Sequence, residues 1–330
     1  MMKFNKILFL NTLILGTLIS ISSYSWLSMW FGLEINLLSM IPLMNNNSIF
    51  NTEAIMKYFL SQAMASMVFL FSILMLNINP YPLLISIMNS SLLTKMGTAP
   101  FHFWFPQVME GLNWNLSLLM LTWQKIAPFV LISYNIQFSL FFMLIMLSSS
   151  IVGSIMGLNQ ISMRKILTFS SINHMSWMLI SMMNSMLLWL DYFLIYSLIS
   201  FNIIILLKIT NIFYFKQLII KLNSNKQLKL FFIMNFFSLA GLPPFLGFLP
   251  KWLTINSLMN QNLWIFSLIL ILFSLITLFF YTRLTLSSLM INLKEQIIMS
   301  NPNNHNWIFT LINLVNLLSL TFITLAFNLI

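Results

Sequence analysis

The chain has 330 residues, of which 59% are hydrophobic and only 6% carry a charged side chain. Soluble domains contain roughly 25% charged residues, so this composition excludes a soluble globular protein. Cysteine is absent, which excludes disulfides, thiolate metal sites and cysteine-ligated iron–sulfur clusters in this chain. The formal charge of +10 does not predict a nucleic-acid partner, because most basic residues fall in short loops between apolar stretches. We expect membrane lipids as neighbours instead.

Long apolar runs, such as residues 263–280, predict transmembrane helices. Lipid offers no partner to backbone N–H and C=O groups, so a spanning segment must be a helix or part of a closed barrel, and a barrel would show short alternating segments. With about 20 residues per span, the sequence predicts an all-α polytopic membrane protein with about eleven transmembrane helices. The expected spans are 4–22, 25–44, 54–76, 81–105, 114–135, 138–158, 163–184, 188–214, 230–260 with a break, 262–284 and 307–328. We expect the first span to be a transmembrane helix and not a cleaved signal peptide.

The positions of Lys and Arg agree with an odd number of spans, which places the two termini on opposite sides of the membrane. Inner loops of membrane proteins collect Lys and Arg. Twelve of the fifteen basic residues then fall on the N-terminal side or at a span end facing it: Lys3, Lys6, Lys57, Arg164, Lys165, Lys208, Lys216, Lys221, Lys226, Lys229, Arg283 and Lys294. The N-terminus is therefore expected inside and the C-terminus outside. The three remaining lysines, Lys95, Lys125 and Lys251, lie within spans.

Two ten-residue segments share one pattern. Residues 97–106 read GTAPFHFWFP and residues 241–250 read GLPPFLGFLP, so both fit G-x-x-P-F-x-x-aromatic-x-P. Proline removes a helical N–H donor, so each segment should break a membrane helix, and an intramembrane lysine stands beside each. Broken helices at matching places are typical of inverted repeats in transporters. We expect a single transmembrane domain, 1–330, with repeats at about 81–214 and 228–305, flanked by 1–77 and 306–330.

Charged side chains at membrane depth predict a path for protons. A charge at the bilayer centre costs roughly 2.5 to 3.5 kcal/mol, so Glu34 and the three intramembrane lysines should pair with one another or line a hydrated path. A carboxylate that approaches or leaves a buried lysine changes the proton affinity of that lysine by a few pK units. We therefore expect Glu34 with Lys95 to act as a switch, Lys125 as the next relay and Lys251 as the terminal donor.

Histidines and the remaining acids have less specific assignments. Imidazole both donates and accepts a proton near neutral pH, so His102 and His174 are candidates to fill gaps in the path, or else satisfied interior histidines. Glu110 and Asp191 lie near predicted span ends, and Glu53 and Glu295 in loops. The scattered histidines lack metal-ligand spacing, and neither a phosphate-binding loop nor a nucleophile motif is present, so we expect no metal site and no covalent catalysis.

Four segments carry a resemblance to a known family. Residues 30–36, 95–106, 121–128 and 241–252, in this order, resemble the antiporter-like subunits of respiratory complex I, and among them the short animal form of NADH dehydrogenase subunit 2. The resemblance implies a core subunit in the membrane arm of proton-pumping NADH:ubiquinone oxidoreductase. It implies transport of protons from matrix to intermembrane space, with the N-terminus on the matrix side of the inner mitochondrial membrane and the C-terminus on the other.

The same resemblance implies roles for individual residues and for partners. Glu34 and Lys95 would form the modulating pair, Lys125 the central relay and Lys251 the exit-side lysine. His102 and His174 would be connecting residues. Flavin, iron–sulfur clusters and ubiquinone would belong to other subunits, so this chain would do no redox chemistry itself. The implied partners are other core and accessory subunits of complex I, especially neighbouring antiporter-like subunits.

Two alternatives stay open. The chain could be a stand-alone cation/proton antiporter subunit, in which the same lysines would serve ion exchange without redox coupling. It could also be a structural membrane subunit, in which the charged residues would form static buried ion pairs that fix the register of the helices. A substitution that preserves assembly but abolishes pumping would exclude the structural reading.

Overall fold

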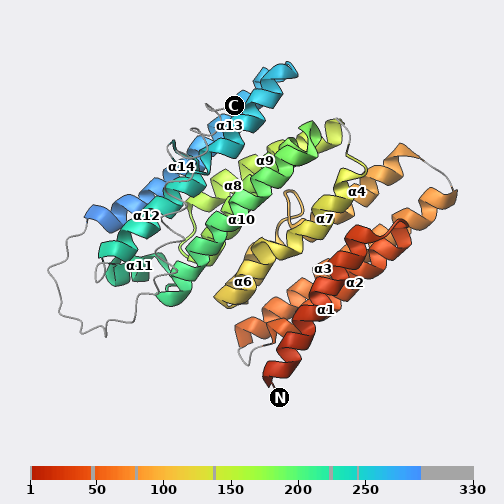
Figure 1. Ribbon diagram of the computed structural model, residues 1–330, viewed down its shortest axis with the longest axis horizontal. Coiled ribbons are helices and arrows are strands. Elements are labelled where there is room, and N and C mark those ends of the chain that lie inside the picture. Colours follow the sequence, from red (N-terminus) through yellow and green to blue (C-terminus); the bar gives the residue numbers. More distant parts are fainter. Residues whose placement is uncertain are drawn as a thin grey trace, which may run out of the picture. The chain divides into compact units, whose positions relative to one another are not determined.

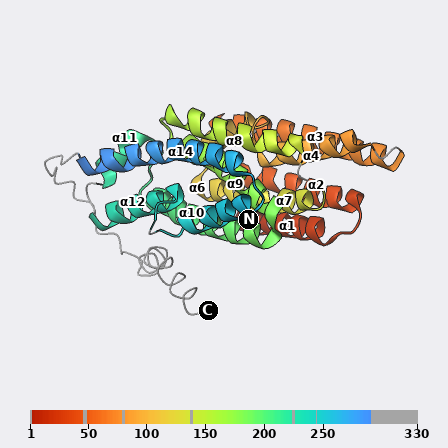
Figure 2. The same cartoon turned by 90° about the horizontal axis from the view of Figure 1, so that it is seen from above.

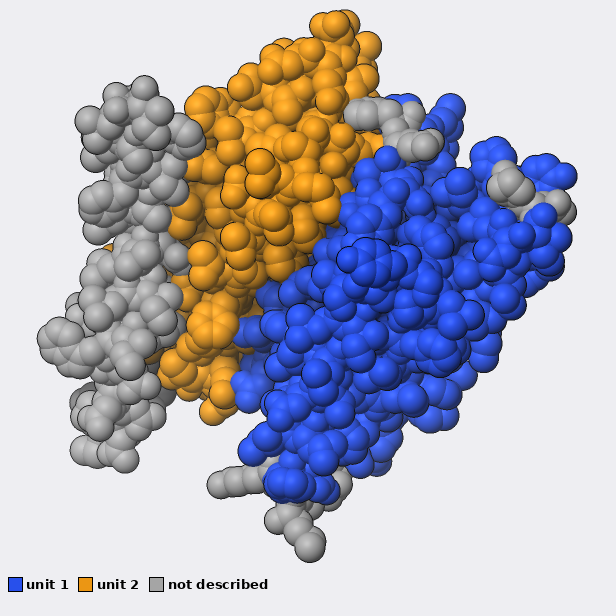
Figure 3. All heavy atoms as spheres, turned by 45° about the vertical axis from the view of Figure 1, so that its right-hand side comes forward, with its two compact units in different colours: residues 1–149 blue, residues 150–330 orange. Residues whose placement is uncertain are grey.

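The computed structural model describes residues 2–45, 49–78, 81–136, 139–222, 226–243 and 245–290. Every named secondary-structure element in these ranges is a helix. The predicted all-α class is thus confirmed. The chain forms two compact units, residues 1–149 and 150–330 (Figure 3). The last expected span, 307–328, lies outside the described residues, as do Lys294 and Glu295.

The first unit is built from the helices drawn in red to yellow in Figure 1. They are α1 (Met2–Ser22), α2 (Trp26–Met44), α3 (Ile49–Ile78), α4 (Pro82–Met96), α5 (Trp104–Gly111), α6 (Trp114–Leu121), α7 (Trp123–Ser133) and the first part of α8 (Leu140–Leu158). Helices α1 and α2 approach closely, because a Cβ on Gly32 would lie 2.8 Å from the Gly16 carbonyl oxygen. Small residues at such crossings are typical of membrane helix pairs. Helix α7 packs against both α4 and α1 (Figure 2).

The second unit contains the remaining helices. They are α9 (Met163–Asn184), α10 (Met186–Ile209), α11 (Phe215–Leu222), α12 (Lys226–Ala240), α13 (Phe248–Asn260) and α14 (Trp264–Met290). Helix α9 is buried along almost its whole length and packs against α10 and α13. It nevertheless contains serine, asparagine and histidine side chains in its middle, so polar groups lie inside this unit.

Seven segments of the described chain are long and apolar enough to cross a membrane. They are Phe4–Ser22, Trp26–Met44, Ile49–Ile78, Trp114–Ser133, Leu140–Leu158, Met186–Ile209 and Trp264–Leu286. The expected number of eleven spans is not confirmed. Helix α9 matches the expected span 163–184 in its bounds but is more polar than a lipid-facing helix, and the broken helices consist of short halves.

The two matching segments break their helices in the same way. Gly97 ends α4 and Gly241 ends α12, each in the left-handed conformation, with φ of 77° and 80°. The N–H of Gly97 donates to the carbonyls of Leu93 and Thr94, and that of Gly241 to the equivalent carbonyls in α12. This is a common helix-ending motif that favours glycine. The next helices begin at equivalent positions, α5 at Trp104 and α13 at Phe248. Both predicted interruptions are confirmed, whereas the proposed repeat boundaries stay a prediction.

A further interruption separates α6 from α7. Pro128 lies inside α7, but the break lies earlier, at Thr122. Proline cannot donate to the carbonyl four residues before it, that of Gln124, and its ring crowds that carbonyl. The disturbance is therefore expected on the N-terminal side of the proline. At the break, the backbone N–H and the hydroxyl of Thr122 both donate to the Leu118 carbonyl, at 3.0 and 2.8 Å.

Candidate functional site: two buried lysines on one polar pocket

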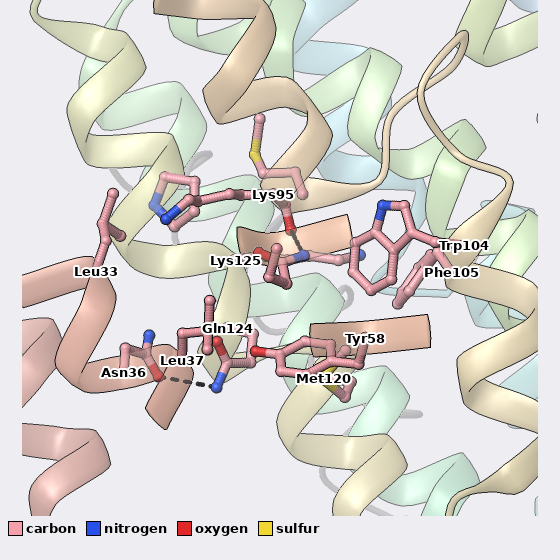
Figure 4. A pocket seen from close by; sticks show the side chains of 13 residues that line it. Leu33, Asn36, Leu37, Tyr58, Lys95, Trp104, Phe105, Met120, Gln124 and Lys125 are labelled. Carbon is pink, nitrogen blue, oxygen red and sulfur yellow. Dashed lines mark hydrogen bonds between the residues drawn. The ribbon is translucent and has the colours of Figure 1, made fainter. Parts of the chain in front are cut away.

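Lys95 of α4 and Lys125 of α7 line the same pocket in the first unit (Figure 4). Their side chains are almost completely buried, with 8% and 1% of the residue exposed. The other polar residues of the lining are Asn36, Tyr58, Gln62 and Gln124. The space that the centre of a water molecule can occupy in this pocket is about 20 Å³. This is enough for about one water, which the surrounding polar groups can bind. The fold thus brings two of the predicted relay residues to one small polar pocket.

Lys125 lies against the first helix break. Its Nζ is 5.5 Å from the centroid of the Phe105 ring, which is the range of a cation–π interaction. Phe105 follows the break directly, in the first turn of α5. In Figure 4 the Lys125 side chain runs toward Phe105 and Trp104. The repeated ten-residue segment therefore supplies part of the wall around this lysine.

Lys95 lies in the last turn of α4, two residues before the break. Its carbonyl oxygen accepts a hydrogen bond from Gln62 Nε2 at 3.3 Å. In Figure 4 its side chain runs toward Leu33, the neighbour of Glu34 on α2. The half-buried Glu34 interacts electrostatically with Lys95, but among the described residues no ion pair within 4.0 Å joins them. The predicted pair is thus within electrostatic range but not in contact.

Neutral polar side chains connect the helices around this pocket. Gln124 Nε2 donates to Asn36 Oδ1 at 3.0 Å and so joins α7 to α2. Trp104 Nε1 donates to the Thr94 carbonyl at 3.0 Å across the first break. Sequence reasoning missed Asn36, Gln62 and Gln124 because it considered only charged groups and histidines. Amide side chains in the middle of apolar spans are a signal that could have found them.

His102 does not join the two lysines. It lies within the first break and is buried, and its ring stacks on Phe103 with centroids 4.4 Å apart. It is absent from the lining of the pocket that contains Lys95 and Lys125. Its predicted role as a connecting residue stays a prediction.

In the second unit, Lys251 of α13 folds back onto the second break. Its Nζ donates to the Ala240 carbonyl, at the end of α12, at 2.8 Å. A cation is favourable there because the last carbonyls of a helix carry a partial negative charge. The position of Gly241 is equally constrained, since a Cβ on it would lie 3.2 Å from the Lys251 Nζ. The Lys251 ammonium group therefore supplies a hydrogen-bond donor to the last carbonyl of α12.

His174 of α9 borders a second, smaller pocket in the same unit. Its Nδ1 lies 3.0 Å from the Tyr192 hydroxyl of α10. The pocket has about 10 Å³ of free volume for a water centre, the lower limit for holding one water. Gly247 and Pro250 line it from the other side, so it reaches the residue next to Lys251.

The remaining acidic residues have peripheral positions. Glu53 is exposed and forms a salt bridge with Lys57, one helical turn away. Asp191 is exposed on α10, and Glu110 is half-buried near the end of α5. Within the described ranges, no group of three His, Asp or Glu side chains could hold a metal ion. Glu34 is thus the described acid that acts electrostatically on one of the pocket lysines, Lys95.

Known proteins resemble this chain over most of its length. A family model described as NADH:quinone oxidoreductase/Mrp antiporter, TM, matches residues 23–81 and 78–277. NADH-ubiquinone oxidoreductase chain 2 of Anopheles gambiae is 48% identical over 329 residues, covering 97% of this chain and 96% of the relative. The protein of that name from Elephas maximus is 39% identical over 333 residues, covering 94% and 95%.

Solved structures share the fold. A chain of respiratory complex I from Thermus thermophilus matches with a TM-score of 0.81 at 24% identity, covering 96% of this chain and 78% of that one. A chain of the Mrp complex from Dietzia matches with a TM-score of 0.72 at 13% identity, covering 83% and 58%. The arrangement of helices is therefore that of antiporter-like membrane subunits.

Proposed function

Because the chain belongs to the NADH-ubiquinone oxidoreductase chain 2 family, as a multi-pass mitochondrial membrane protein and a subunit of complex I, we propose that it conducts protons through the pocket shared by Lys95 and Lys125. The observation that supports this most is the pocket itself. Two almost fully buried lysines line one polar space with room for about one water. A bound water would serve as a proton carrier between the two lysines; their side chains run in opposite directions in Figure 4, so transfer between the amines also requires a change of side-chain rotamer.

The proposed path uses each predicted residue according to its surroundings. Glu34 acts on Lys95 through its charge, so any movement of α2 that changes their separation changes the proton affinity of that lysine. Lys125 receives the proton across the pocket. Lys251 and His174 then serve as exit-side groups in the second unit, and His102 as a connecting group. The proposed direction is from matrix to intermembrane space, with the N-terminus on the matrix side.

The energy for this transport must come from outside the chain. We place flavin, iron–sulfur clusters and ubiquinone in other subunits of the complex, since this chain has no cysteine and we assign it no redox chemistry. Neighbouring antiporter-like subunits and accessory subunits are the proposed contacts in the membrane.

Lys125→Met tests the relay. Methionine has a similar length and flexibility but cannot hold a proton, and replacement of a buried charge by an apolar residue is often neutral for stability. We expect the complex to assemble while the number of protons moved per electron falls, or redox turnover is lost together with pumping. Assembly is checked on a native gel, and the ratio is measured with the complex reconstituted in vesicles.

Lys57→Met is the matched control for this experiment. Lys57 is a partly exposed lysine whose partner, Glu53, is exposed. The same loss of one positive charge should leave both turnover and the proton-to-electron ratio unchanged there. A normal ratio at normal turnover in Lys125→Met would show that this lysine is a structural charge.

A further inference from the structure

Tyr58 of α3 supplies a phenol to the pocket that Lys95 and Lys125 share. Only 2% of the residue is exposed, and its ring packs against that of Trp104, with centroids 6.0 Å apart. A buried ring has few ways to turn, because the protein interior around it is close-packed. In Figure 4 the hydroxyl end of the ring points toward Gln124 of α7. The fold therefore holds this hydroxyl in one position at the pocket.

The hydroxyl of Tyr58 forms no hydrogen bond with any residue that the structure describes. A buried hydroxyl is normally bonded to the protein or to an ordered water, and leaving it unbonded costs free energy. The pocket in front of it has room for about one water. A water in this pocket is thus the partner that the described part of the chain leaves to the hydroxyl.

Two amide oxygens complete the ligands of this water. Gln62 Nε2 donates to the Lys95 carbonyl at 3.3 Å, and Gln124 Nε2 donates to Asn36 Oδ1 at 3.0 Å, so both amide groups are held in place. Among the described residues, neither amide oxygen accepts a hydrogen bond. A water can donate one hydrogen to each of these oxygens and accept the O–H of Tyr58. A buried water typically makes about three such bonds.

A water bound by these neutral groups keeps one lone pair for a lysine ammonium group. The Lys95 and Lys125 side chains run in opposite directions in Figure 4, so the water must stay in place until a rotamer change brings both amines within reach. The ammonium then gives a proton to the water oxygen, and the water gives one of its own protons to the neutral amine of the other lysine. One N–H bond breaks and another forms. Tyr58 keeps its charge throughout, so it can hold the water at every stage.

We propose that Tyr58 is a positioning residue that holds the water through which protons pass between Lys95 and Lys125. The amide oxygens of Gln62 and Gln124 are the other ligands of this water. The inference rests on the proposed function of the chain as a proton conductor and deepens it, because it names the groups that bind the proton carrier. It concerns the first unit alone.

Tyr58→Phe removes only the hydroxyl and is the first test. Loss of one neutral hydrogen bond to the water should slow proton pumping per assembled complex about fivefold. The ratio of redox turnover in H₂O to that in D₂O should rise, because the slowed step moves a proton. Assembly and thermal stability should not change, since no described residue loses a hydrogen bond and phenylalanine keeps the ring contact with Trp104. A purely structural hydroxyl would not alter the isotope effect.

Tyr281→Phe is the matched control. Tyr281 is a phenol of the second unit, is 1% exposed, and packs against Phe236 and Phe280 with ring centroids 5.8 and 4.4 Å away. It is absent from the lining of the pocket that contains Lys95 and Lys125. The same loss of a buried hydroxyl should leave the pumping rate and the isotope effect unchanged there.

A double variant tests whether Tyr58 acts through the lysine path. Lys125→Met blocks that path under the proposed function, so adding Tyr58→Phe should reduce pumping no further. All rates are measured with reconstituted vesicles and divided by the amount of assembled complex on a native gel. A lower yield of a variant therefore does not count as a lower rate.

Four results would overturn the inference: normal pumping in Tyr58→Phe, equal losses in Tyr58→Phe and Tyr281→Phe, an additive loss in the double variant, or failure of Tyr58→Phe to assemble. The last would show that the hydroxyl has a structural role. Lys125→Met shows which claim has failed. If Lys125→Met reduces pumping and Tyr58→Phe does not, only the role of Tyr58 is wrong. If neither reduces it, the proposed proton path is wrong and this inference with it.

Discussion

Gly247→Ala is expected to prevent formation of the second helix break and to abolish assembly of the subunit. A Cβ at this position would lie 1.7 Å from the carbonyl oxygen of Ser238 and 2.8 Å from its carbonyl carbon. Both atoms belong to the backbone of α12 and cannot rotate away. The backbone of Gly247, with φ of −63° and ψ of −14°, is one that alanine adopts easily, so the effect is purely steric. We expect a destabilisation above about 4 kcal/mol, which few single substitutions reach.

Gly157→Ala is the matched control for this prediction. It adds the same methyl group to a glycine of the second unit that lies within a helix, α8, but there the nearest atom is Cε1 of the Phe280 ring, at 2.9 Å. A side-chain ring can shift, so assembly should decrease only slightly. Native gels of the two variants measure the difference. Normal assembly of Gly247→Ala would mean that the loop between α12 and α13 does not pack against Ser238 as described.

Lys251→Arg is expected to assemble normally and to lose pumping. Arginine keeps the positive charge and the donors that bind the Ala240 carbonyl, so it can replace the lysine at the end of α12. Its guanidinium does not release a proton in proteins, so it cannot serve as a relay. Lys251→Met should lose pumping as well, and it should also weaken the broken helix, since it leaves that carbonyl without its donor. Proton-to-electron ratios and native gels measure the two effects separately.

This pair of variants decides between a relay and a static structural charge at Lys251. If Lys251 is only a static charge, Lys251→Arg should pump normally. If Lys251 is a proton relay, Lys251→Arg should not pump. Lys221→Arg is the matched control, because Lys221 Nζ also donates to carbonyls at a helix end, those of Thr210 and Asn211, but is exposed. Pumping should be normal in that variant.

The sequence predicted most helices well because each is defined by a long apolar run, which can be recognised within one continuous stretch of the chain. The expected span 163–184 coincides with α9, and a helix is interrupted within each of the two matching segments, as predicted. Three features were missed: the break at Thr122, the short helix α11, and the start of α3 at Ile49 instead of residue 54. Each depends on packing or on a few residues at a helix end, where an apolar pattern carries little information.

The buried lysines of the candidate site can be recognised in the sequence, but their contacts cannot. A charged side chain in an apolar span is visible in the sequence, so Lys95, Lys125 and Lys251 were found. The bond from Lys251 to the end of α12 depends on how a seven-residue loop returns to its helix. The contact between His174 and Tyr192 requires the antiparallel packing of α9 on α10, which joins residues 18 positions apart. No spacing rule indicates either contact.

The most direct test of the shared pocket is the proton-to-electron ratio of Lys95→Met, Lys125→Met and the double variant, measured in the same vesicles together with redox turnover. If a proton passes between the two lysines through one pocket, either single variant blocks the path, and the double variant should pump no worse than the single variants. An additive further loss in the double variant would show two independent paths. It would contradict the central role that this account gives to the pocket.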